Sequence, residues 1–488
     1  MTGAEALPLA LAIPLLGSVL IALLGRWPNL REAATLATAG GLFLVVLQVL
    51  FGLLAGEPAE VELMRFLPGV PLALHSEPLS ILFALVASGL WIVTSVYAIG
   101  YMRGNNEKHQ TRFYVCFAVA IFGAMGVAFA ANLLTLFLFY EVLTLSTYPL
   151  VTHKGDDNAR RGGRVYLGVL LATSIGLLLP AVIWVYSETG TLDFRPGGIL
   201  EGHMGGIAAT ALLMLFLFGV GKAAVMPVHR WLPAAMVAPT PVSALLHAVA
   251  VVKAGVFTLT KVVLYIFGLD FLREVPYEVV AVYLAGFTLV AGSVVALYQT
   301  NIKRMLAYST ISQLSYIVLA TMVLTPLAEI GAVVHIVAHA VAKITLFFAA
   351  GAIYVASKKT EIHQLDGIGY RMPVTMGAFA IAALSMIGVP PTGGFVSKWY
   401  MIAGAFQHDY YFVLAVLALS TALNAGYFLP IVFRAFFRRE PEPPARDHGE
   451  APVTMVAALA FTALLTLLVF VFNGPLVTFE QVILEVAP

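Results

Sequence analysis

Six charged side chains lie deep inside apolar stretches of a 488-residue sequence that contains 27 lysines and arginines and 26 aspartates and glutamates. They are Glu141, Lys222, Lys253, Lys261, Lys343 and Lys398. At the depth of a membrane, a charged group is costly unless it is paired, hydrated or neutralised, so such residues usually mark ion paths or proton relays. A desolvated lysine also releases its proton near neutral pH. These residues therefore predict proton transfer.

A second group of residues repeats with helical spacing. His335, His339 and Lys343 are four residues apart, so on a helix they lie along one slowly drifting stripe, about 6 Å apart along the axis. A neutral imidazole both donates and accepts hydrogen bonds and titrates near pH ~6.5, which favours a proton wire. Two alternatives stay open: the histidines only hydrogen-bond neighbouring helices, or they bind a metal, which is disfavoured because no carboxylate shares their face.

Glu141 is the acid among the six residues, and it shares a helical face with Thr144 and Tyr148. A lone carboxylate in lipid stays protonated, whereas a carboxylate that faces a lysine can ionise. We expect Lys222 to be this partner, because a pair that opens and closes switches the lysine's affinity for a proton. The alternative is a static buried ion pair, which contributes little to stability.

The remaining candidates lie near span ends or breaks. His247 and Lys253 are six residues apart, so they do not share a face, but we expect both to reach one cavity at different depths. Lys261 lies near the end of the same apolar stretch, and its long side chain is expected to extend to the membrane surface. Lys398 follows a glycine- and proline-rich break that is expected to expose it to water.

Composition defines the class of protein. The sequence is 60% hydrophobic and 11% charged, with a mean hydropathy of +0.92, whereas about 25% of the residues in soluble domains are charged. This predicts an integral membrane protein, and the net charge of +1 gives no reason to expect nucleic acid. The single cysteine, Cys116, excludes a disulfide framework and a four-cysteine iron–sulfur or zinc site. No basic segment precedes the first apolar run, so we expect it to remain as a helix.

Apolar windows of about 20 residues predict fourteen membrane spans. They are 6–25, 33–55, 79–101, 113–130, 132–151, 165–186, 207–229, 241–267, 279–299, 305–324, 330–356, 373–402, 411–437 and 453–473. Loops after odd-numbered spans hold 19 lysines and arginines, whereas the opposite loops hold three, Arg65, Arg195 and Arg273. By the positive-inside rule, we expect a multi-pass protein of the cell inner (plasma) membrane with both termini on the non-cytoplasmic side.

Two spans are interrupted by proline and glycine. One break surrounds Lys222 and contains Pro227 and Pro233, and the other covers 388–394 and precedes Lys398. Such broken helices line cavities or pack inside protein. Because the breaks fall five helices apart, the spans predict an all-α membrane fold with two inverted five-helix repeats. The expected parts are three N-terminal helices in 1–110, a first half-channel in 111–268, a second half-channel in 269–438, and a charged loop with a final helix in 439–488.

Several longer motifs resemble one family of membrane proteins. The motifs are Phe139-Tyr140-Glu141, Gly221-Lys222-Ala223-Ala224, Trp231-Leu232-Pro233, Pro239-Thr240-Pro241-Val242-Ser243-Ala244-Leu245-Leu246-His247, the spaced set His335, His339 and Lys343, and the run from Gly388 to Lys398. They are similar to signatures of the antiporter-like membrane subunits of respiratory complex I and of Mrp-type cation/proton antiporters. The resemblance implies a fourteen-helix inverted repeat with a central hydrated axis.

The resemblance also implies roles for single residues. It makes Glu141 and Lys222 the ion pair of the first half, Lys343 the central lysine of the second half, and Lys398 the exit residue. The full set of candidate proton-transfer residues is Glu141, Lys222, His247, Lys253, His335, His339, Lys343 and Lys398.

Departures from the family patterns narrow the subfamily. The chain stops soon after span fourteen, unlike the largest complex I subunit of the family, and Lys398 stands where the middle-sized one usually has glutamate. His247 resembles the largest subunit and Mrp A, whereas Lys253 followed by Ala254-Gly255 resembles Mrp D and the middle-sized subunit. The mixture indicates an Mrp D-like subunit or a relative in a hydrogenase-type complex.

The leading interpretation is a proton-translocating subunit of a multisubunit Mrp-type monovalent cation/proton antiporter. The alternative is a proton-pumping subunit of a complex I-like or membrane-bound hydrogenase oxidoreductase. Expected partners are other membrane subunits, protons, Na⁺ or K⁺, and the lipid bilayer. The choice of cation and the enzyme class depend on the parent complex.

Two further classes are disfavoured. A quinone- or haem-binding redox subunit needs a cofactor motif, and the sequence offers none, so we expect no cofactor, no metal and no redox centre in this chain. A stand-alone solute carrier needs a substrate pocket that these residues do not indicate.

Overall fold

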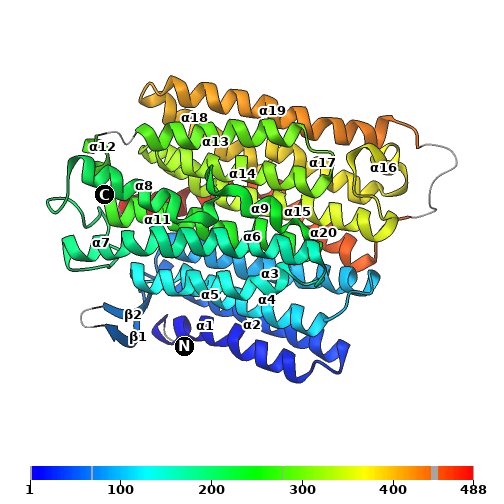
Figure 1. Ribbon diagram of the computed structural model, residues 1–488, viewed down its shortest axis with the longest axis horizontal. Helices are drawn as coiled ribbons and strands as arrows, with labels where there is room; N and C mark the ends of the chain where they lie inside the picture. The colour runs from blue at the N-terminus through cyan, green and yellow to red at the C-terminus, as the bar shows by residue number, and fades with distance from the viewer. Residues whose placement is uncertain (1–2, 68–69, 277–278, 441–448, 487–488) are drawn as a thin grey trace.

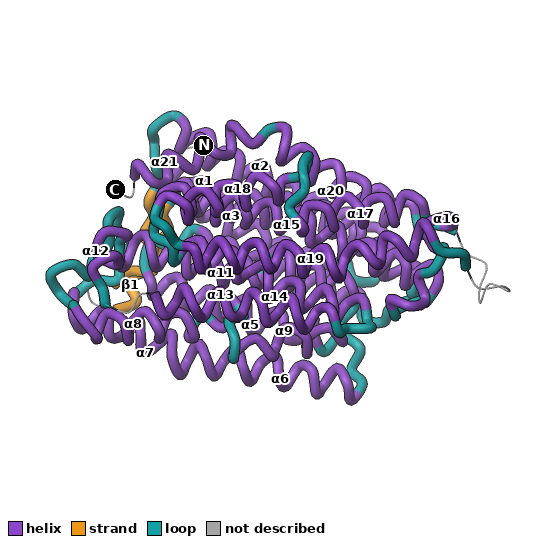
Figure 2. Tube along the Cα trace, turned by 90° about the horizontal axis from the view of Figure 1, so that it is seen from above, coloured by secondary structure: helices purple, strands orange, loops and turns teal. Residues whose placement is uncertain are grey.

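The structure is a computed structural model that describes residues 3–67, 70–276, 279–440 and 449–486. Its helices run along one long axis and pack side by side (Figure 1). Figure 2 shows the described strands gathered at one end of this bundle. We call that end the hairpin end, and we call the opposite end, formed by the connections at 24–27, 105–109, 152–156, 298–301 and 358–361, the basic end.

The helices of the first half follow one another in short steps. They are α1 (Gly3–Leu23), α2 (Pro28–Leu54), α3 (Pro78–Gly104), α4 (Gln110–Ala128), α5 (Leu133–Val151), α6 (Asp157–Thr173), α7 (Leu179–Thr189), α8 (Gly206–Gly219), α9 (Trp231–Ala234), α10 (Thr240–Ala244) and α11 (Val251–Val262). The π-helical turns Ser174–Leu178, Leu245–Val249 and Val263–Phe267 keep neighbouring pieces continuous.

The second half has the same helical character. Its helices are α12 (Leu269–Glu274), α13 (Val279–Leu297), α14 (Ile302–Thr321), α15 (Pro326–Ser357), α16 (Ile368–Arg371), α17 (Pro373–Ile387), α18 (Gly393–Gln407), α19 (Tyr411–Phe437), α20 (Val453–Val471) and α21 (Asn473–Val486). Helix α1 begins and α21 ends toward the hairpin end (Figure 1).

The predicted all-α membrane fold is confirmed. Within the described residues, eleven helical segments are long and apolar enough to cross a membrane. The other three expected spans correspond to α8 with the turns after it, to α14, which is more polar, and to α17 with α18. The two halves are not thereby shown to be inverted repeats, which stays a prediction.

Both predicted breaks occur. Helix α8 stops at Gly219, a single 3-10 turn covers Gly221–Ala223, and Ala224 adopts a left-handed conformation with φ of 56°. Helix α17 stops at Ile387, where Gly388 has φ of 92°, and α18 begins at Gly393. A left-handed residue cannot continue a helix, so each break leaves backbone groups free for other partners.

A short antiparallel hairpin was not predicted. Strands β1 (Glu60–Leu67) and β2 (Val70–His75) pair so that Glu60 lies opposite His75. Windows of membrane-span length average over strands of this size, so hydropathy predicts only a loop at this segment. The hairpin covers one end of the bundle and helps to enclose polar groups there.

Helix starts are set by polar caps. The side chains of Asn132, Asp156 and Thr325 each accept a hydrogen bond from a backbone N–H three residues further on, at the starts of α5, α6 and α15. Such caps satisfy the unpaired N–H groups of a first turn. The cap at Thr325 starts α15 several residues before the predicted span, which brings Glu329 into the helix.

The centre of the bundle is formed by α10, α11 and α15. The most apolar stretch of Thr240–Phe267 is 100% buried and that of α15 is 94% buried, whereas that of α2 is only 28% buried. A helix that is buried all round has no lipid face. This central part of the bundle holds five of the eight candidate residues, His247, Lys253, His335, His339 and Lys343, whereas outer helices such as α2 face lipid.

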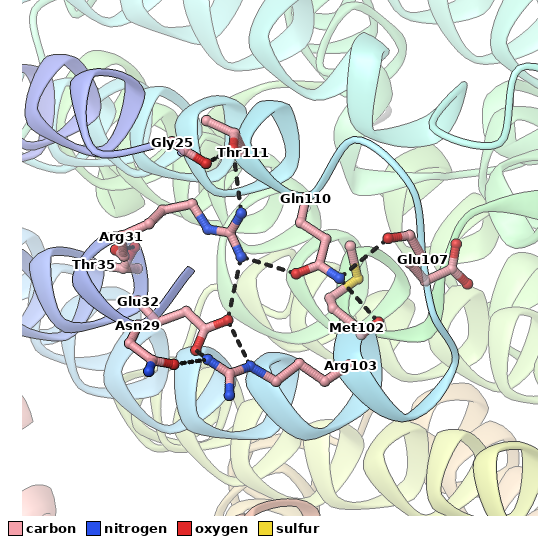
Figure 3. Close-up of polar contacts among 10 residues, drawn as sticks. All are labelled: Gly25, Asn29, Arg31, Glu32, Thr35, Met102, Arg103, Glu107, Gln110 and Thr111. Carbon is pink, nitrogen blue, oxygen red and sulfur yellow. Dashed lines mark hydrogen bonds and ion pairs between the residues drawn. The ribbon is translucent and has the colours of Figure 1, made fainter. Parts of the chain in front are cut away.

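A polar cluster at the basic end fastens the N-terminal helices (Figure 3). Arg103 on α3 and Arg31 on α2 both bind the carboxylate of Glu32, and Arg31 also donates to Gln110 on α4 at 2.9 Å. Arg31 and Glu32 are each only 4% exposed. These two arginines, which the sequence placed among the loop residues, thus join three helices.

Candidate functional site

A direct contact between the two central helices lies at the core of the site. The Nζ atom of Lys253 on α11 lies 2.6 Å from Nδ1 of His339 on α15, and both residues are fully buried. The hydrogen bond joins an amine to an imidazole, which are two groups that exchange protons near neutral pH. Its partners were both predicted, but their pairing was not.

His335 continues the line along α15. Its ring is stacked on that of His339 with centroids 6.0 Å apart and an angle of 19°. Its Nε2 lies 3.0 Å from Oε1 of Gln313, and its Nδ1 lies 2.8 Å from the hydroxyl of Ser397. Because Oε1 of the glutamine only accepts, Nε2 donates, and Nδ1 of the neutral ring is left to accept from the serine.

The break after α17 links this line to Lys398. The amide nitrogen of Gln313 donates to the Met386 carbonyl at 3.3 Å, and Nζ of Lys398 donates to the same carbonyl at 3.0 Å and to that of Ile387 at 2.9 Å. These carbonyls belong to the last turn of α17, where they have no intrahelical partner. The break thus acts as the binding site of the lysine.

Lys343 lies on a side branch of the same network. Its Nζ donates to the hydroxyl of Ser309 at 2.9 Å, and this hydroxyl lies 3.1 Å from that of Tyr427. Tyr427 donates to Asn424, whose amide reaches the Met386 carbonyl at 3.3 Å. The expected single stripe therefore divides, because His339 turns toward α11, whereas His335 and Lys343 both contact α14, through Gln313 and Ser309.

The expected ion pair between Glu141 and Lys222 is not formed in this structure. Nζ of Lys222 donates to the Tyr140 carbonyl at 2.8 Å and to the Thr144 hydroxyl at 2.6 Å. Both carboxylate oxygens of Glu141 are buried without a hydrogen-bond partner among the described residues. Lys222 therefore hydrogen-bonds two neutral oxygens of α5 and forms no ion pair with Glu141, which lies on the same helix.

Glycine lets the first break pack against the central helix. A side chain at Gly255 of α11 would meet the backbone nitrogen of Ala223 at 2.4 Å. Only a residue without a Cβ atom allows this approach. The backbone of Lys222 is therefore held directly beside α11 at Gly255. Gly255 lies two residues after Lys253 on that helix.

His247 lies on the π-helical turn Leu245–Val249. Neither of its ring nitrogens has a hydrogen-bond partner among the described residues, and its ring centroid lies 4.7 Å from that of Phe347. No hydrogen bond joins it to Lys253. Isolated π-helical turns occur often at functional sites, because they redirect a side chain within a helix.

Lys261 does not extend to the membrane surface as expected. Its Nζ lies 2.7 Å from Oε1 of Glu77, and the two side chains are 1% and 8% exposed. It also donates to the Ala130 carbonyl at 2.7 Å. The end of α11 is covered by the hairpin and by neighbouring connections, so the lysine finds a buried partner before it reaches a surface.

Buried acids are more frequent than the apolar windows indicate. Glu329 in the first turn of α15 is 1% exposed, and both of its carboxylate oxygens lack a hydrogen-bond partner among the described residues. Glu32 and Glu77 are 4% and 7% exposed. All three lie at the starts of helices, outside the apolar windows, and for that reason they were not among the predicted residues.

Neutral polar residues form the other part of the site that was not predicted. Gln313, Ser397, Ser309, Tyr427 and Asn424 connect the charged residues to one another. The prediction was based on ionisable residues, whereas these links carry no charge. Their signal was a polar α14 among apolar neighbours, with Ser309, Ser312, Gln313 and Ser315 on one short stretch.

The fold and the site together define an integral membrane protein with a buried line of protonatable groups that runs from α11 through α15 to the break between α17 and α18. The family described as NADH:quinone oxidoreductase/Mrp antiporter, TM, matches residues 130–424. The chain belongs to this family, which confirms the resemblance found in its motifs.

Individual relatives come from both branches of the family. NADH-quinone oxidoreductase subunit N of Desulforudis audaxviator (strain MP104C) is 32% identical over 403 residues, covering 82% of this chain and 80% of the relative. The D subunit of the Na(+)/H(+) antiporter of Alkalihalophilus pseudofirmus is 26% identical over 463 residues, covering 94% of this chain and 92% of the relative. A chain in the structure of the Mrp complex from Dietzia sp. DQ12-45-1b has the same fold, with a TM-score of 0.87 and 23% identity over 99% of this chain and 97% of that one.

Proposed function

We propose that this chain is a proton-translocating, antiporter-like subunit of a multisubunit membrane complex. The observation that carries the proposal is the connected line of buried polar groups, which are Lys253, His339, His335, Gln313, the Met386 carbonyl and Lys398. Lysines stand at both ends of this line and two imidazoles lie between them. The two imidazoles pass a proton by exchanging donor and acceptor roles, whereas Gln313 and the Met386 carbonyl hold His335 and Lys398 close together so that water can complete the step between them.

The stacked histidines are the step at which water enters the line. No hydrogen bond connects the two rings, and Nε2 of His339 has no partner among the described residues. This nitrogen is therefore available to a water molecule in the axis. The imidazole exchanges one proton with Lys253 at Nδ1 and another with this water at Nε2, so a proton moves along the line in either direction while the ring stays in place.

Each half of the chain supplies one half-channel in this proposal. We assign residues 111–268 to the first and 269–438 to the second, flanked by the helices of 1–110 and the segment 439–488. The two breaks support this division, because each brings a buried lysine against neighbouring helix backbone: Lys222 contacts the Tyr140 carbonyl of α5, and Lys398 contacts the last carbonyls of α17. Glu141 and Lys222 then switch the first half by approaching and separating.

The parent complex is proposed to be of the Mrp type, in which the chain takes the place of the Mrp D protein and works with other membrane subunits on H⁺ and Na⁺ or K⁺. The similarity to the D subunit of the Na(+)/H(+) antiporter of Alkalihalophilus pseudofirmus, which covers 94% of this chain and 92% of the relative, supports this choice. The second candidate is a complex I-like or hydrogenase-type oxidoreductase. The 32% identity to the oxidoreductase relative from Desulforudis audaxviator supports it.

We propose that the basic end faces the cytoplasm and the hairpin end faces the other side of the inner (plasma) membrane. The support is the positive-inside rule, because the loops predicted for one side hold 19 lysines and arginines and the loops predicted for the other side hold three. Both termini are then non-cytoplasmic.

The test uses everted membrane vesicles from cells that express the whole complex. After respiration has acidified the vesicle interior, addition of NaCl or KCl should collapse the pH gradient if the complex is an antiporter. Glu141→Gln should abolish this collapse at an unchanged amount of assembled complex, because the amide keeps the shape and loses the titration. Normal collapse with this variant refutes the switching role of Glu141. If proton movement requires an electron donor and does not respond to added salt, the parent complex is an oxidoreductase and not an Mrp-type antiporter.

A further inference from the structure

Glu77 and Lys261 are a second buried carboxylate and lysine. Unlike Glu141 and Lys222, they form an ion pair in this structure. Glu77 is the first residue before α3, and its carboxylate contacts Lys261 of α11 at 2.7 Å and accepts from the Ser80 hydroxyl at 3.0 Å. Lys261 completes its shell with the Ala130 carbonyl at 2.7 Å. A buried ion pair is a weak source of stability compared with well-packed apolar residues. Stability alone therefore does not explain why Glu77 and Lys261 are present at this position.

The pair forms the inner wall of a pocket at the hairpin end. This pocket has a volume of about 210 Å³, and its lining includes Glu60, Glu77, Ala130, Asp193, Arg195 and Lys261. The lining residues come from the hairpin, the connections before α5 and α8, and the ends of α3 and α11. The volume is sufficient for several water molecules, and the polar lining provides them with partners. Glu60 is exposed, so the pocket communicates with the hairpin-end surface.

Lys261 and Lys253 lie on one face of α11. They are eight residues apart, which corresponds to about 12 Å along the helix axis. Phe257 lies between them at the same four-residue spacing, and its ring packs against that of Phe83 with centroids 4.9 Å apart. Both rings are buried. Lys261 Nζ lies 5.6 Å from the centroid of the Phe257 ring, so this buried ring and its neighbour Phe83 stand between the proton line at Lys253 and the ion pair at the pocket.

We propose that Glu77 and Lys261 form the outlet through which protons pass from Lys253 to the hairpin end, and that Phe83 and Phe257 form the barrier that this outlet must open. The proposal rests on proton translocation by this chain. The line from Lys253 to Lys398 does not show where protons leave the chain. The proposal adds the hairpin end as the side of release, the two phenylalanine rings as the barrier, and Glu77 as the last proton acceptor.

The transfer involves protons only. When the phenylalanine rings separate and admit water, an N–H bond of the Lys253 ammonium breaks and its proton passes along that water to Glu77, where an O–H bond forms. The neutral carboxyl group no longer attracts Lys261, so the ion pair opens. The O–H bond then breaks, the proton leaves to water in the pocket, and the carboxylate binds Lys261 again. The closed pair blocks return, because the ammonium of Lys261 repels a cation that approaches from the pocket.

The test measures passive proton leak in liposomes that contain the purified whole complex, under a potassium diffusion potential and without substrate. Phe257→Ala removes half of the barrier, so we expect leak to rise several-fold above that of the unmodified complex. The double variant Phe257→Ala with Glu77→Gln should return to the original leak, because the amide cannot accept the proton. Phe257→Ala with Glu60→Gln is the matched control and should leak as much as Phe257→Ala alone, since Glu60 lies on the same pocket outside the path.

Either of two results overturns the proposal: Phe257→Ala without increased leak, or leak that persists when Glu77→Gln is added. If the alanine variant does not assemble, Phe257→Leu is used with the same two expectations. The leak needs no turnover, so this experiment can fail while the salt-driven transport of the complex remains normal. If no form of the complex, unmodified or variant, shows salt-driven transport, but the leak still depends on Glu77, the antiport assignment is refuted and the outlet proposal is not.

Discussion

Gln313 offers the sharpest test of the proton line from Lys253 to Lys398. It carries no charge, so its loss affects transport only if the contacts between His335 and Lys398 matter. Its side chain accepts from His335 at 3.0 Å and donates to the Met386 carbonyl at 3.3 Å. We predict that Gln313→Leu, which has nearly the same size and no polar atoms, lowers proton transport by about tenfold or more, as expected for loss of a proton-transfer step.

The stability cost of this change follows from the contacts that remain. The Met386 carbonyl keeps its bonds to Lys398 and Asn424, so only Nε2 of His335 loses its partner. One unsatisfied buried donor costs about 1–3 kcal/mol, which a large membrane protein tolerates. The complex should therefore assemble in normal amounts while its transport falls.

The assay is the rate of pH-gradient collapse in everted vesicles, normalised to the amount of assembled complex. Gln299→Leu is the matched control, because the Gln299 side chain bonds the Val295 carbonyl of its own helix end and no other group among the described residues. It should transport normally. Normal transport by Gln313→Leu at normal assembly would refute the idea that proton transfer between His335 and Lys398 depends on this amide.

Three further predictions address other parts of the molecule. Lys343→Arg should reduce transport to background, because a guanidinium does not release its proton at any accessible pH, and vesicle assays with full activity would show that a fixed charge suffices there. Glu32→Gln should lower the unfolding free energy in detergent by about 1–3 kcal/mol, because it weakens charged hydrogen bonds to two arginines, whereas the exposed Glu62→Gln should cost at most about 1 kcal/mol; equal costs would contradict this. Burial lowers the pKa of His153 in the loop after α5 to about 4, so the folded protein binds this proton less readily than the unfolded chain and loses stability as the pH falls from 6.5 to about 4. His153→Gln should reduce the drop in melting temperature between pH 7 and pH 5, and an unchanged drop would exclude this residue as its source.

Much of the fold follows from composition and spacing, because lipid requires every span to be helical. The breaks at Lys222 and before Lys398 were predictable for the same reason, since glycine and proline interrupt helices wherever they cluster. The hairpin at Glu60–His75 was not, because its strands are shorter than the windows that reveal spans. The start of α15 was misplaced because a cap at Thr325 decides it, and hydropathy does not register caps.

The site was predictable in its members more than in its contacts. His335 and His339 could be placed on one face from their spacing, because both lie on one continuous helix. The contact between Lys253 and His339 joins residues 86 positions apart, and only the packing of α11 on α15 determines it. Charge complementarity likewise suggested Lys222 for Glu141, but a nearby carbonyl and a hydroxyl satisfy the lysine, and local geometry of that kind does not appear in a sequence.

The central claim is that Lys253 and His339 exchange a proton, and the proton flux of Lys253→Arg in liposomes containing the whole complex tests it most directly. The arginine keeps the positive charge and a donor toward Nδ1 of His339, but it does not release a proton. The proposed mechanism predicts flux at the level of empty liposomes, at a normal amount of assembled complex. Flux equal to that of the unmodified complex would show that Lys253 holds a fixed charge and transfers no proton, which would contradict the proposed function of the whole line.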